Sequence, residues 1–232
     1  MTVTKKITTL ALTLVMLMCL IPSTVFAAGR SGWYQEGDRW YYYQADMMLA
    51  RTWLKWQSNW YYFADDGHMV ENGSFYVDFD KKIYVFDKGG ALTKKTGWVS
   101  RRDAWFYVKK GGVAATGWKK DGGKWYLLCT HKDFQIFPGA MYTHVKKYID
   151  GKTYLFTGSG ALVSKAGWVS EKFGSGIVWY YSGKDGVART GWLRLGKKWY
   201  CFDVYGQMYS NITTVIDGTV YSFDKDGVCL NP

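Results

Sequence analysis

The chain has 232 residues, a formal net charge of +11, and an aromatic content of 19%, far above ordinary usage. Its composition and repeat period exclude a collagen-type triple helix, a coiled coil and a nucleic-acid-binding module. Aromatic side chains this abundant are too many for one small core, so many should lie at surfaces or between repeats. The positive charge either favours an anionic partner or serves solubility alone.

The first 27 residues are typical of a signal peptide. Lys5 and Lys6 give a basic start, residues 7–21 are mostly apolar, and residues 25–27 offer a cleavage site after Ala27. A membrane anchor is the alternative, but the apolar run is short for ~30 Å of hydrocarbon. No later segment is apolar enough to span a membrane. We therefore expect export from the cell and one repeat domain over residues 28–232.

Residues 52–69, TWLKWQSNWYYFADDGHM, hold the best-preserved copy of a short repeat. The run Trp60 to Phe63 has high β-propensity. Asp65-Asp66-Gly67 has turn chemistry, because Gly67 can adopt the positive φ of a tight hairpin. The stretch therefore predicts a β-hairpin with glycine at its bend. Glycine recurs at the matching bend of other copies: Gly90, Gly112, Gly160, Gly186, Gly206 and Gly227.

Two columns of residues mark nine copies of this unit, and twelve of the thirteen Trp fall in these columns, with Trp56 left over. The first marker is Trp33, Trp53, Phe75, Trp98, Trp118, His144, Trp168, Trp192 and Ile212. The second marker is Trp40, Trp60, Ile83, Trp105, Trp125, Thr153, Trp179, Trp199 and Val220, in steps of 20 to 28 residues. Because strands this short cannot bury a hydrophobic face alone, neighbouring units must stack. We predict an all-β solenoid of about nine β-hairpins.

A longer period groups the units into triplets. Units three, six and nine lack both Trp, while the other six units keep both. The chain therefore divides into triplets at residues 33–97, 98–167 and 168–232, and the order within each is intact, intact, degenerate.

The strand that starts at each second marker has two distinct faces. The residue after the marker is aromatic in all nine units: Tyr41, Tyr61, Tyr84, Phe106, Tyr126, Tyr154, Tyr180, Tyr200 and Tyr221. The residue three after it is apolar except at Ser182. These two positions share a strand face, and the marker points to the other. The Trp that vary between units thus lie on one face, and the constant aromatic residues on the opposite face.

Residues for catalysis or metal binding do not cluster. His68, His131 and His144 fall at different unit positions, and no phosphate-binding loop or nucleophile elbow occurs. Acidic residues gather in turns, where they cap bends. We expect no enzyme activity, no metal and no cofactor. The cysteines after the signal peptide form no disulfide framework, although Cys201 and Cys229 could pair if neighbouring repeats bring them together.

Two Trp of one unit and a Tyr of the next can form three walls of an aromatic box. Such a box attracts a quaternary ammonium by about 0.5–2 kcal/mol per ring, and choline is a known example. The same walls could stack on the apolar face of a sugar ring. Alternatively, the Trp pack the core of the solenoid, but three units do without them and should still fold.

The stretches 52–69, 116–128 (TGWKKDGGKWYLL) and 190–208 (TGWLRLGKKWYCFDVYGQM) resemble the cell-wall-binding, or choline-binding, repeats of surface proteins of Gram-positive bacteria. The resemblance extends over essentially all of residues 28–232. It implies a β-hairpin solenoid with about three hairpins per superhelical turn. It also implies choline sites between consecutive hairpins, each formed by two Trp of one hairpin and an aromatic residue of the next, often with a Met.

The resemblance implies six boxes on this chain: Trp33 and Trp40 with Tyr61; Trp53 and Trp60 with Tyr84 and Met69; Trp98 and Trp105 with Tyr126; Trp118 and Trp125 with Tyr154; Trp168 and Trp179 with Tyr200; and Trp192 and Trp199 with Tyr221 and Met208. Units three, six and nine cannot form a Trp pair, but each supplies the Tyr that closes the preceding box. With three hairpins per turn, the solenoid should have two ligand-competent edges and one blank edge.

In that family the ligand is choline on teichoic acids of the cell envelope. The resemblance therefore implies a non-catalytic module, secreted and attached non-covalently to the bacterial surface by choline-bearing teichoic acid or another cell-envelope polymer. Similar repeats in glucan-binding proteins and clostridial toxins bind carbohydrate, and Ile149 to Phe156 resembles the toxin repeats. A lectin or adhesin for glucan or host glycans is the alternative, and a structural protein with all Trp in its core is a third hypothesis.

Overall fold

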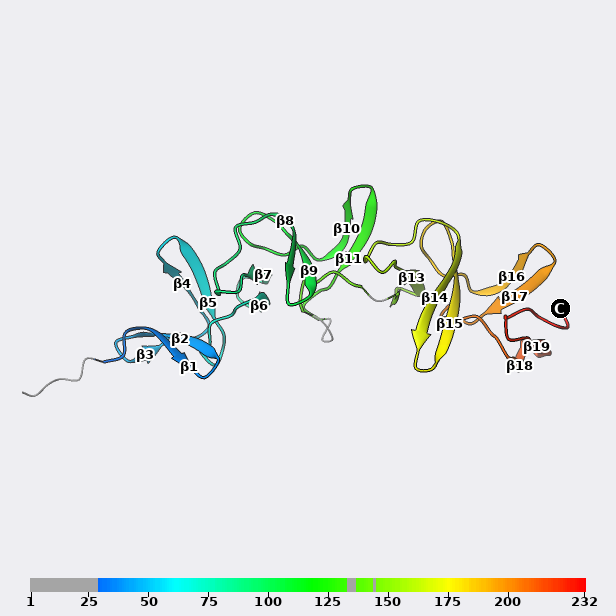
Figure 1. Ribbon diagram of the computed structural model, residues 1–232, viewed down its shortest axis with the longest axis horizontal. Helices are drawn as coiled ribbons and strands as arrows, with labels where there is room; N and C mark the ends of the chain where they lie inside the picture. The colour runs from blue at the N-terminus through cyan, green and yellow to red at the C-terminus, as the bar shows by residue number, and fades with distance from the viewer. Residues whose placement is uncertain (1–28, 133–136, 144) are drawn as a thin grey trace, which may run out of the picture. The chain divides into compact units, whose positions relative to one another are not determined.

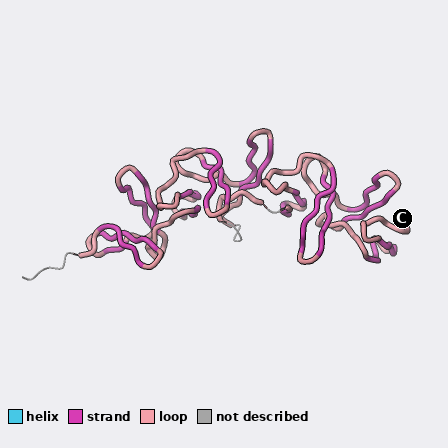
Figure 2. Tube along the Cα trace, in the orientation of Figure 1, coloured by secondary structure: helices cyan, strands magenta, loops and turns pink. Residues whose placement is uncertain are grey.

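The computed structural model describes residues 29–132, 137–143 and 145–232 (Figure 1). The described residues divide into two compact units, one that ends at Leu49 and one that begins at Ala50. Strands and loops make up all of the described part, which contains no helix (Figure 2) and hence none that could cross a membrane. The predicted signal peptide and His144 lie outside the described residues.

The first unit is one small antiparallel sheet. It consists of β1 (Gly32–Glu36), β2 (Arg39–Gln44) and β3 (Met47–Met48), with β2 in the middle. The first hairpin, β1–β2, pairs Trp33 with Tyr42 and Gln35 with Trp40.

The second unit contains eight two-stranded antiparallel sheets, each a hairpin of consecutive strands. Their strands are β4 (Thr52–Trp56), β5 (Asn59–Phe63), β6 (Gly73–Val77), β7 (Lys82–Phe86), β8 (Gly97–Arg101), β9 (Ala104–Val108), β10 (Gly117–Asp121), β11 (Lys124–Leu128), β12 (Lys146–Ile149), β13 (Lys152–Leu155), β14 (Gly167–Phe173), β15 (Gly176–Ser182), β16 (Gly191–Leu195), β17 (Lys198–Phe202), β18 (Ile212–Ile216) and β19 (Thr219–Phe223). With β1–β2, these hairpins confirm the predicted all-β chain of nine hairpin units. The number of hairpins per superhelical turn stays a prediction.

The hairpin turn does not lie at the glycine that the sequence singled out. In β4–β5, Trp56 pairs with Asn59, so the turn is the two-residue loop Gln57-Ser58, between the two Trp markers. Gln57 takes the positive φ of 53° that this turn requires. Gly67 instead bends the segment after the hairpin, where the backbone of Met69 bridges back to Phe63. The placement of the hairpin bend at Gly67 was therefore wrong, because each unit reverses direction twice.

Strand register also corrects the first marker in the three units without Trp. In β4–β5 the first Trp faces the residue two after the second marker, as Trp53 faces Tyr62. The corresponding residues in the degenerate hairpins are Ser74, Lys146 and Thr213, which face Val85, Leu155 and Ser222. The predicted markers Phe75, His144 and Ile212 were chosen by residue type. Pairing across the hairpin depends on loop length instead, so the alignment slipped by one or two residues.

Backbone hydrogen bonds join each hairpin of the second unit to the next. The carbonyl of the second marker accepts from the backbone of the segment that follows the next hairpin, and this contact repeats seven times. The bonds are Leu92 to Trp60 (2.7 Å), Ala114 to Ile83 (2.8 Å), Met141 to Trp105 (2.6 Å), Leu162 to Trp125 (2.8 Å), Ala188 to Thr153 (2.8 Å), Met208 to Trp179 (2.9 Å) and Cys229 to Trp199 (2.8 Å). We call the contact between consecutive hairpins a junction and number it by the earlier hairpin.

The core lies where the predicted apolar column falls. The side chains three residues after the second marker are 3% exposed or less from the second hairpin to the ninth: Phe63, Phe86, Val108, Leu128, Phe156, Ser182, Phe202 and Phe223. Burying one such side chain contributes about 1.5–3 kcal/mol. Each hairpin alone could not enclose this column, so its burial comes from stacking.

The recurrent glycines lie where one repeat meets the next. Gly160 has a φ of +77°, and a Cβ there would lie 2.7 Å from the side chain of Met141. Gly227 likewise has a φ of +78°, and its Cβ would lie 2.4 Å from Met208. The glycine column is therefore required both by the backbone conformation and by the side chain of the preceding repeat.

Candidate functional site

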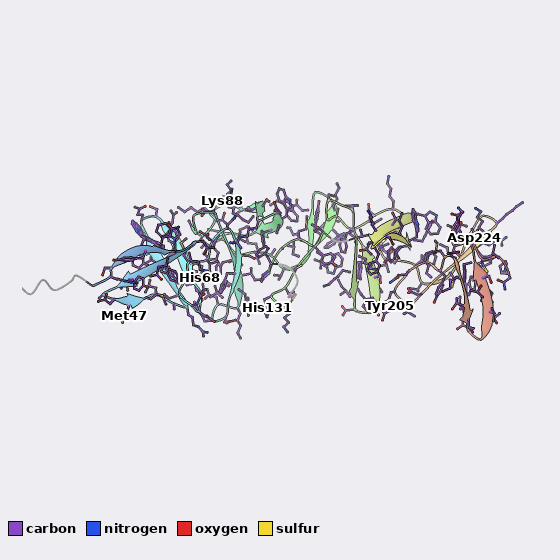
Figure 3. The ribbon with its side chains drawn as sticks, turned by 60° about the horizontal axis from the view of Figure 1, so that its bottom comes forward. Met47, His68, Lys88, His131, Tyr205 and Asp224 are labelled. Carbon is purple, nitrogen blue, oxygen red and sulfur yellow. The ribbon has the colours of Figure 1, made fainter. Side chains whose placement is uncertain are left out.

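In the described residues, no three His, Cys, Asp or Glu could together hold a metal ion. His68 follows β5 and His131 follows β11 (Figure 3). His68 bonds the carboxylate of Asp66, and His131 stacks on Tyr76 with ring centroids 4.1 Å apart. His68 thus contacts a residue of its own turn, whereas His131 contacts a residue of the third hairpin.

The seventh junction forms an aromatic box around a cavity. Trp168 of β14 and Trp179 of β15 have ring centroids 6.3 Å apart at an interplanar angle of 88°. Tyr200 of the next hairpin lies 4.9 Å from Trp168. With Met208, these residues line a cavity of about 380 Å³. Both Trp remain more than a third exposed, so the box opens to solvent.

A second cavity, of about 520 Å³, lies at the fifth junction and is lined by Trp118, Trp125, Tyr154 and Leu162. The rings of Trp118 and Tyr154 are 4.9 Å apart, and Phe156 lies 6.0 Å from Trp118. Trp118 and Trp125 are 38% and 43% exposed. This junction therefore combines a buried apolar floor with two accessible indole walls.

The second and eighth junctions repeat the perpendicular Trp pair. The centroids of Trp53 and Trp60 are 6.4 Å apart, and those of Trp192 and Trp199 are 6.3 Å apart. At the fourth junction, Trp98 contacts Tyr126 at 4.9 Å, and its indole nitrogen donates to Asp121 at 3.0 Å. The backbone of Met141 bonds the carbonyl of Trp105 beside it.

The Tyr that the sequence assigned to each box contacts the first Trp of that box throughout the second unit. The centroid distances are 4.8 Å for Tyr84, 4.9 Å for Tyr126, 4.9 Å for Tyr154, 4.9 Å for Tyr200 and 4.7 Å for Tyr221. Burial, with a hydrogen bond to Asp80, raises the pKa of Tyr84 to about 12. The phenol of Tyr84 is thus neutral at physiological pH.

The first predicted box stays a prediction. Trp33 and Trp40 lie in the first unit, 6.5 Å apart at 80°, and Tyr61 belongs to the second unit. Trp33 also contacts Tyr42 of its own hairpin at 5.1 Å.

Met208 lies at the box one hairpin earlier than predicted. Met208 lines the cavity of Trp168 and Trp179 rather than the box of Trp192 and Trp199, where Cys229 bonds the Trp199 carbonyl. At the second junction, Leu92 takes the position that we predicted for Met69. The segment after each hairpin folds back onto the preceding hairpin, so a residue close in sequence to one Trp pair serves another.

Sequence reasoning missed two further groups of aromatic contacts. The residue two after the second marker meets the first Trp edge-on, as in Trp53–Tyr62 at 5.1 Å and Trp168–Tyr181 at 5.2 Å. The buried aromatic column forms the floor, with Phe86 at 5.9 Å from Trp53. The period-two alternation of the strand was the signal for the first group, because every second residue shares the face of the marker.

Charged groups surround the boxes. Lys184 and Asp185 line the cavity at the fifth junction, and Lys225 and Asp226 line the cavity at the seventh. On several hairpins a cation of the chain also lies against the second Trp, as Arg194 does 5.8 Å from the Trp199 ring centroid. The indole faces of these hairpins thus lie within reach of positive charge.

Cys201 and Cys229 lie in one buried cluster with Phe223 near the eighth junction, and both are thiols. Burial raises the pKa of the Cys201 thiol. The proposed pairing is thus not formed in this structure.

Comparison with known proteins gives one family. A family model described as a putative cell wall binding repeat matches residues 52–69 and 116–128. Glucosyltransferase-S of Streptococcus mutans is 25% identical over 194 residues, covering 83% of this chain and 12% of that protein. Glucosyltransferase-I of Streptococcus downei is 28% identical over 194 residues, covering 83% of this chain and 11% of that protein. The chain thus spans only a small part of the length of these curated relatives.

Among solved structures, choline binding protein F from Streptococcus pneumoniae is 30% identical, with 83% of this chain and 61% of that chain covered and a TM-score of 0.44. The choline-binding domain of CbpL from the same species is 24% identical, with 88% and 98% covered and a TM-score of 0.40. Residues 52–69 and 116–128 thus match the cell wall binding repeat, and the hairpins and aromatic columns of these two stretches recur along the described chain.

Proposed function

We propose that this chain is a non-catalytic module that binds choline groups of cell-envelope polymers at its Trp-lined junctions. The observation that carries the proposal is the box at the seventh junction. There Trp168 and Trp179, 39% and 37% exposed, stand perpendicular beside Tyr200 around a cavity of about 380 Å³. Rings held open to solvent in this way offer π faces to a ligand.

The chemistry of the box suits a quaternary ammonium. Such an ion has no N–H to donate, so it is recognised by aromatic faces, each worth about 0.5–2 kcal/mol. At the rim of this cavity Lys225 and Asp226 form an ion pair at 3.1 Å, so the aromatic faces rather than a net rim charge would attract the cation. The thioether of Met208 completes an apolar, polarisable lining.

Several weak sites on one chain would give firm attachment. A polymer that carries many choline groups can occupy several boxes at once, and such avidity gains about 10²–10⁴ over a single site without new contacts. Residues 28–232 keep 28 Lys and Arg against 19 Asp and Glu, and this net charge of +9 adds attraction to the anionic backbone of teichoic acid, which salt should weaken. The module would then be held non-covalently at the bacterial surface after secretion.

A carbohydrate ligand is the second candidate. The identities of 25% and 28% to two proteins named glucosyltransferases, over 83% of the chain, favour it, because their name refers to the transfer of glucosyl groups. A sugar ring could stack on the same indole faces. The two candidates differ in charge, since choline is a cation and a glucan is neutral and carries many hydroxyl groups.

Affinity chromatography tests the proposal. The chain should be retained on a matrix bearing choline, released by free choline, and pass through a matrix bearing ethanolamine, whose amine keeps its N–H groups. The matched variant Trp168→Ala, Trp118→Ala should bind the choline matrix less well. Retention on dextran, with free passage through the choline matrix, would replace the proposal by the carbohydrate candidate.

A further inference from the structure

The sixth hairpin, β12–β13, differs from the Trp-bearing hairpins in one informative position. Lys146 faces Leu155 in the register in which Trp53 faces Tyr62, so Lys146 stands where the first Trp of a box would stand. The residue that would close this box is Tyr180, which follows the second marker of the next hairpin as Tyr200 and Tyr221 do. Lys146 and Tyr180 are therefore the counterparts of a Trp–Tyr wall pair.

The Lys146 side chain reaches that Tyr and makes a closed set of polar contacts with it. Its ammonium donates a hydrogen bond to the Tyr180 hydroxyl and lies 3.1 Å from the Glu171 carboxylate. The Tyr180 hydroxyl donates in turn to Glu171 at 3.3 Å. The three groups thus form a triangle that spans the sixth and seventh hairpins.

This triangle is partly shielded from solvent. Tyr180 is 0% exposed, and the side chains of Lys146 and Glu171 are 32% and 20% exposed. The Lys146 nitrogen lies 5.0 Å from the Tyr180 ring centroid while it bonds the hydroxyl, so the ammonium sits at the hydroxyl edge of the ring. Hydrogen bonding and ion pairing therefore hold it more than the π face does.

The ammonium keeps its charge in this position. Burial alone would lower the pKa of Lys146, but the hydrogen bonds to Tyr180 and Glu171 outweigh that effect and leave the pKa raised. The other residues at this junction are small. The second marker is the buried Thr153, and the backbone of Ala188 bonds the Thr153 carbonyl.

We propose that the sixth junction carries its own cation: the Lys146 ammonium, clamped between Tyr180 and Glu171, closes this junction without any external ligand. The comparison with ligand-filled boxes rests on the proposed function, whereas the clamp itself does not. The chain then has one permanently closed joint between hairpins six and seven, while the Trp-lined junctions on either side await a ligand. Lys146 also excludes a quaternary ammonium from this junction by like charge.

The clamp defines what could replace the lysine. Truncation of Lys146 to alanine would leave a gap bounded by the Tyr180 hydroxyl oxygen and the Glu171 carboxylate. Both groups accept hydrogen bonds, and the carboxylate carries a negative charge. A small primary alkylammonium ion, which carries three N–H donors, fits this chemistry. Tetramethylammonium has the same charge but no N–H, so it should not fill the gap.

Chemical rescue tests the proposal. Lys146→Ala should lower the Tm relative to the wild type, and n-propylammonium at about 10–100 mM, the range of a weak single site, should restore part of that loss. The control Lys152→Ala removes an exposed lysine from the same hairpin and should show neither the loss nor the rescue. An equal response of all three proteins to the amine, or an unchanged Tm in Lys146→Ala, would overturn the proposal.

Two further measurements keep the test decisive. If Lys146→Ala does not fold, its refolding yield should rise with n-propylammonium and not with tetramethylammonium, and equal yields would count against the clamp. Glu171→Gln keeps an acceptor but removes the charge, so it should lower the Tm and abolish rescue in the double variant. Choline takes no part in these experiments, so a chain that ignores choline can still pass them.

Discussion

The third and seventh junctions use the same backbone contact for different purposes. In each, the second-marker carbonyl accepts a hydrogen bond from the segment after the next hairpin, Ala114 to Ile83 in one and Met208 to Trp179 in the other. At the third junction Ile83 is 4% exposed and Phe106 0%, so the space is filled. At the seventh, Trp179 is 37% exposed and borders an open cavity.

The difference separates stacking from binding. The third junction folds with Ile83 and Ala114 at the positions that Trp179 and Met208 occupy in the seventh. The exposed Trp are therefore not needed for one repeat to pack on the next. The residues whose backbone bonds the second-marker carbonyl also differ between the two kinds of junction. They are Ala114 and Ala188 at the junctions without Trp. The five predictions that follow perturb one side of this comparison at a time.

The largest effect should come from the filled junction. Phe106→Ala removes a ring with 0% exposure, and a buried Phe→Ala change costs about 3–5 kcal/mol of unfolding free energy. Urea denaturation followed by circular dichroism measures the loss. The same change at the half-exposed Trp105 should cost much less, and equal losses would mean that the second markers are core residues.

Gly186→Ala should come next. Gly186 has a φ of +76°, and a Cβ there would lie 2.5 Å from Leu162 and 2.7 Å from the Val163 carbonyl oxygen. Gly151 has a similar φ of +78° with nothing within 4 Å. We expect about 1 kcal/mol from backbone strain in Gly151→Ala and about 1–3 kcal/mol more in Gly186→Ala. Equal losses of unfolding free energy in denaturation would show that the repeats do not touch there.

Trp179→Ala tests the open junction. Loss of one aromatic wall should weaken choline binding at the seventh junction by about tenfold, the equivalent of about 1.4 kcal/mol. Isothermal titration of choline measures the change in this variant. The double variant Trp192→Ala, Trp179→Ala should lose two sites independently. Unaltered isotherms in both would remove these Trp from the ligand site.

Tyr154→Ala should act on one site. Its ring lies 4.9 Å from Trp118, so the fifth junction should lose a wall worth about 0.5–2 kcal/mol while the seventh is unchanged. Choline titration of Tyr154→Ala in the Trp118→Ala background should reveal no further loss. Equal weakening of every site would identify Tyr154 as structural.

The smallest effect concerns pH. The pKa of Tyr84 is raised from 10.0 to about 12, so the folded state favours the neutral phenol. Its contribution is complete below pH 10, the unfolded value, and disappears as the pH rises toward 12. The Tm advantage of the wild type over Tyr84→Phe should therefore shrink between pH 9 and about pH 11.5. A constant difference would contradict the assigned pKa.

Repetition made the hairpins and the Tyr walls predictable. Trp and Tyr columns recur at fixed spacing, so strand, face and partner could be inferred for Tyr84 and Tyr200 before any contact was known. The turn at Gln57-Ser58 was missed because neither residue is a usual choice for positive φ, whereas Gly67 is.

Residue spacing did not predict the contacts that form where the segment after a hairpin folds back onto the preceding hairpin. Met208 follows the hairpin of Trp199 in sequence but folds back to the box of Trp179. Lys146 was hidden for a related reason, since only the pairing with Leu155 shows that it stands in a Trp position. Local patterns fix the strands, and the path between them decides which repeat a side chain serves.

Titration of tryptophan fluorescence with choline, and separately with dextran, tests the central claim most directly. Ligand entry between Trp168 and Trp179 should quench the indole emission at millimolar choline, while dextran leaves it unchanged. The variant Trp179→Ala should keep part of the response through the other junctions. A response to dextran alone, or to neither ligand, would contradict the assignment of the Trp-lined junctions as choline sites.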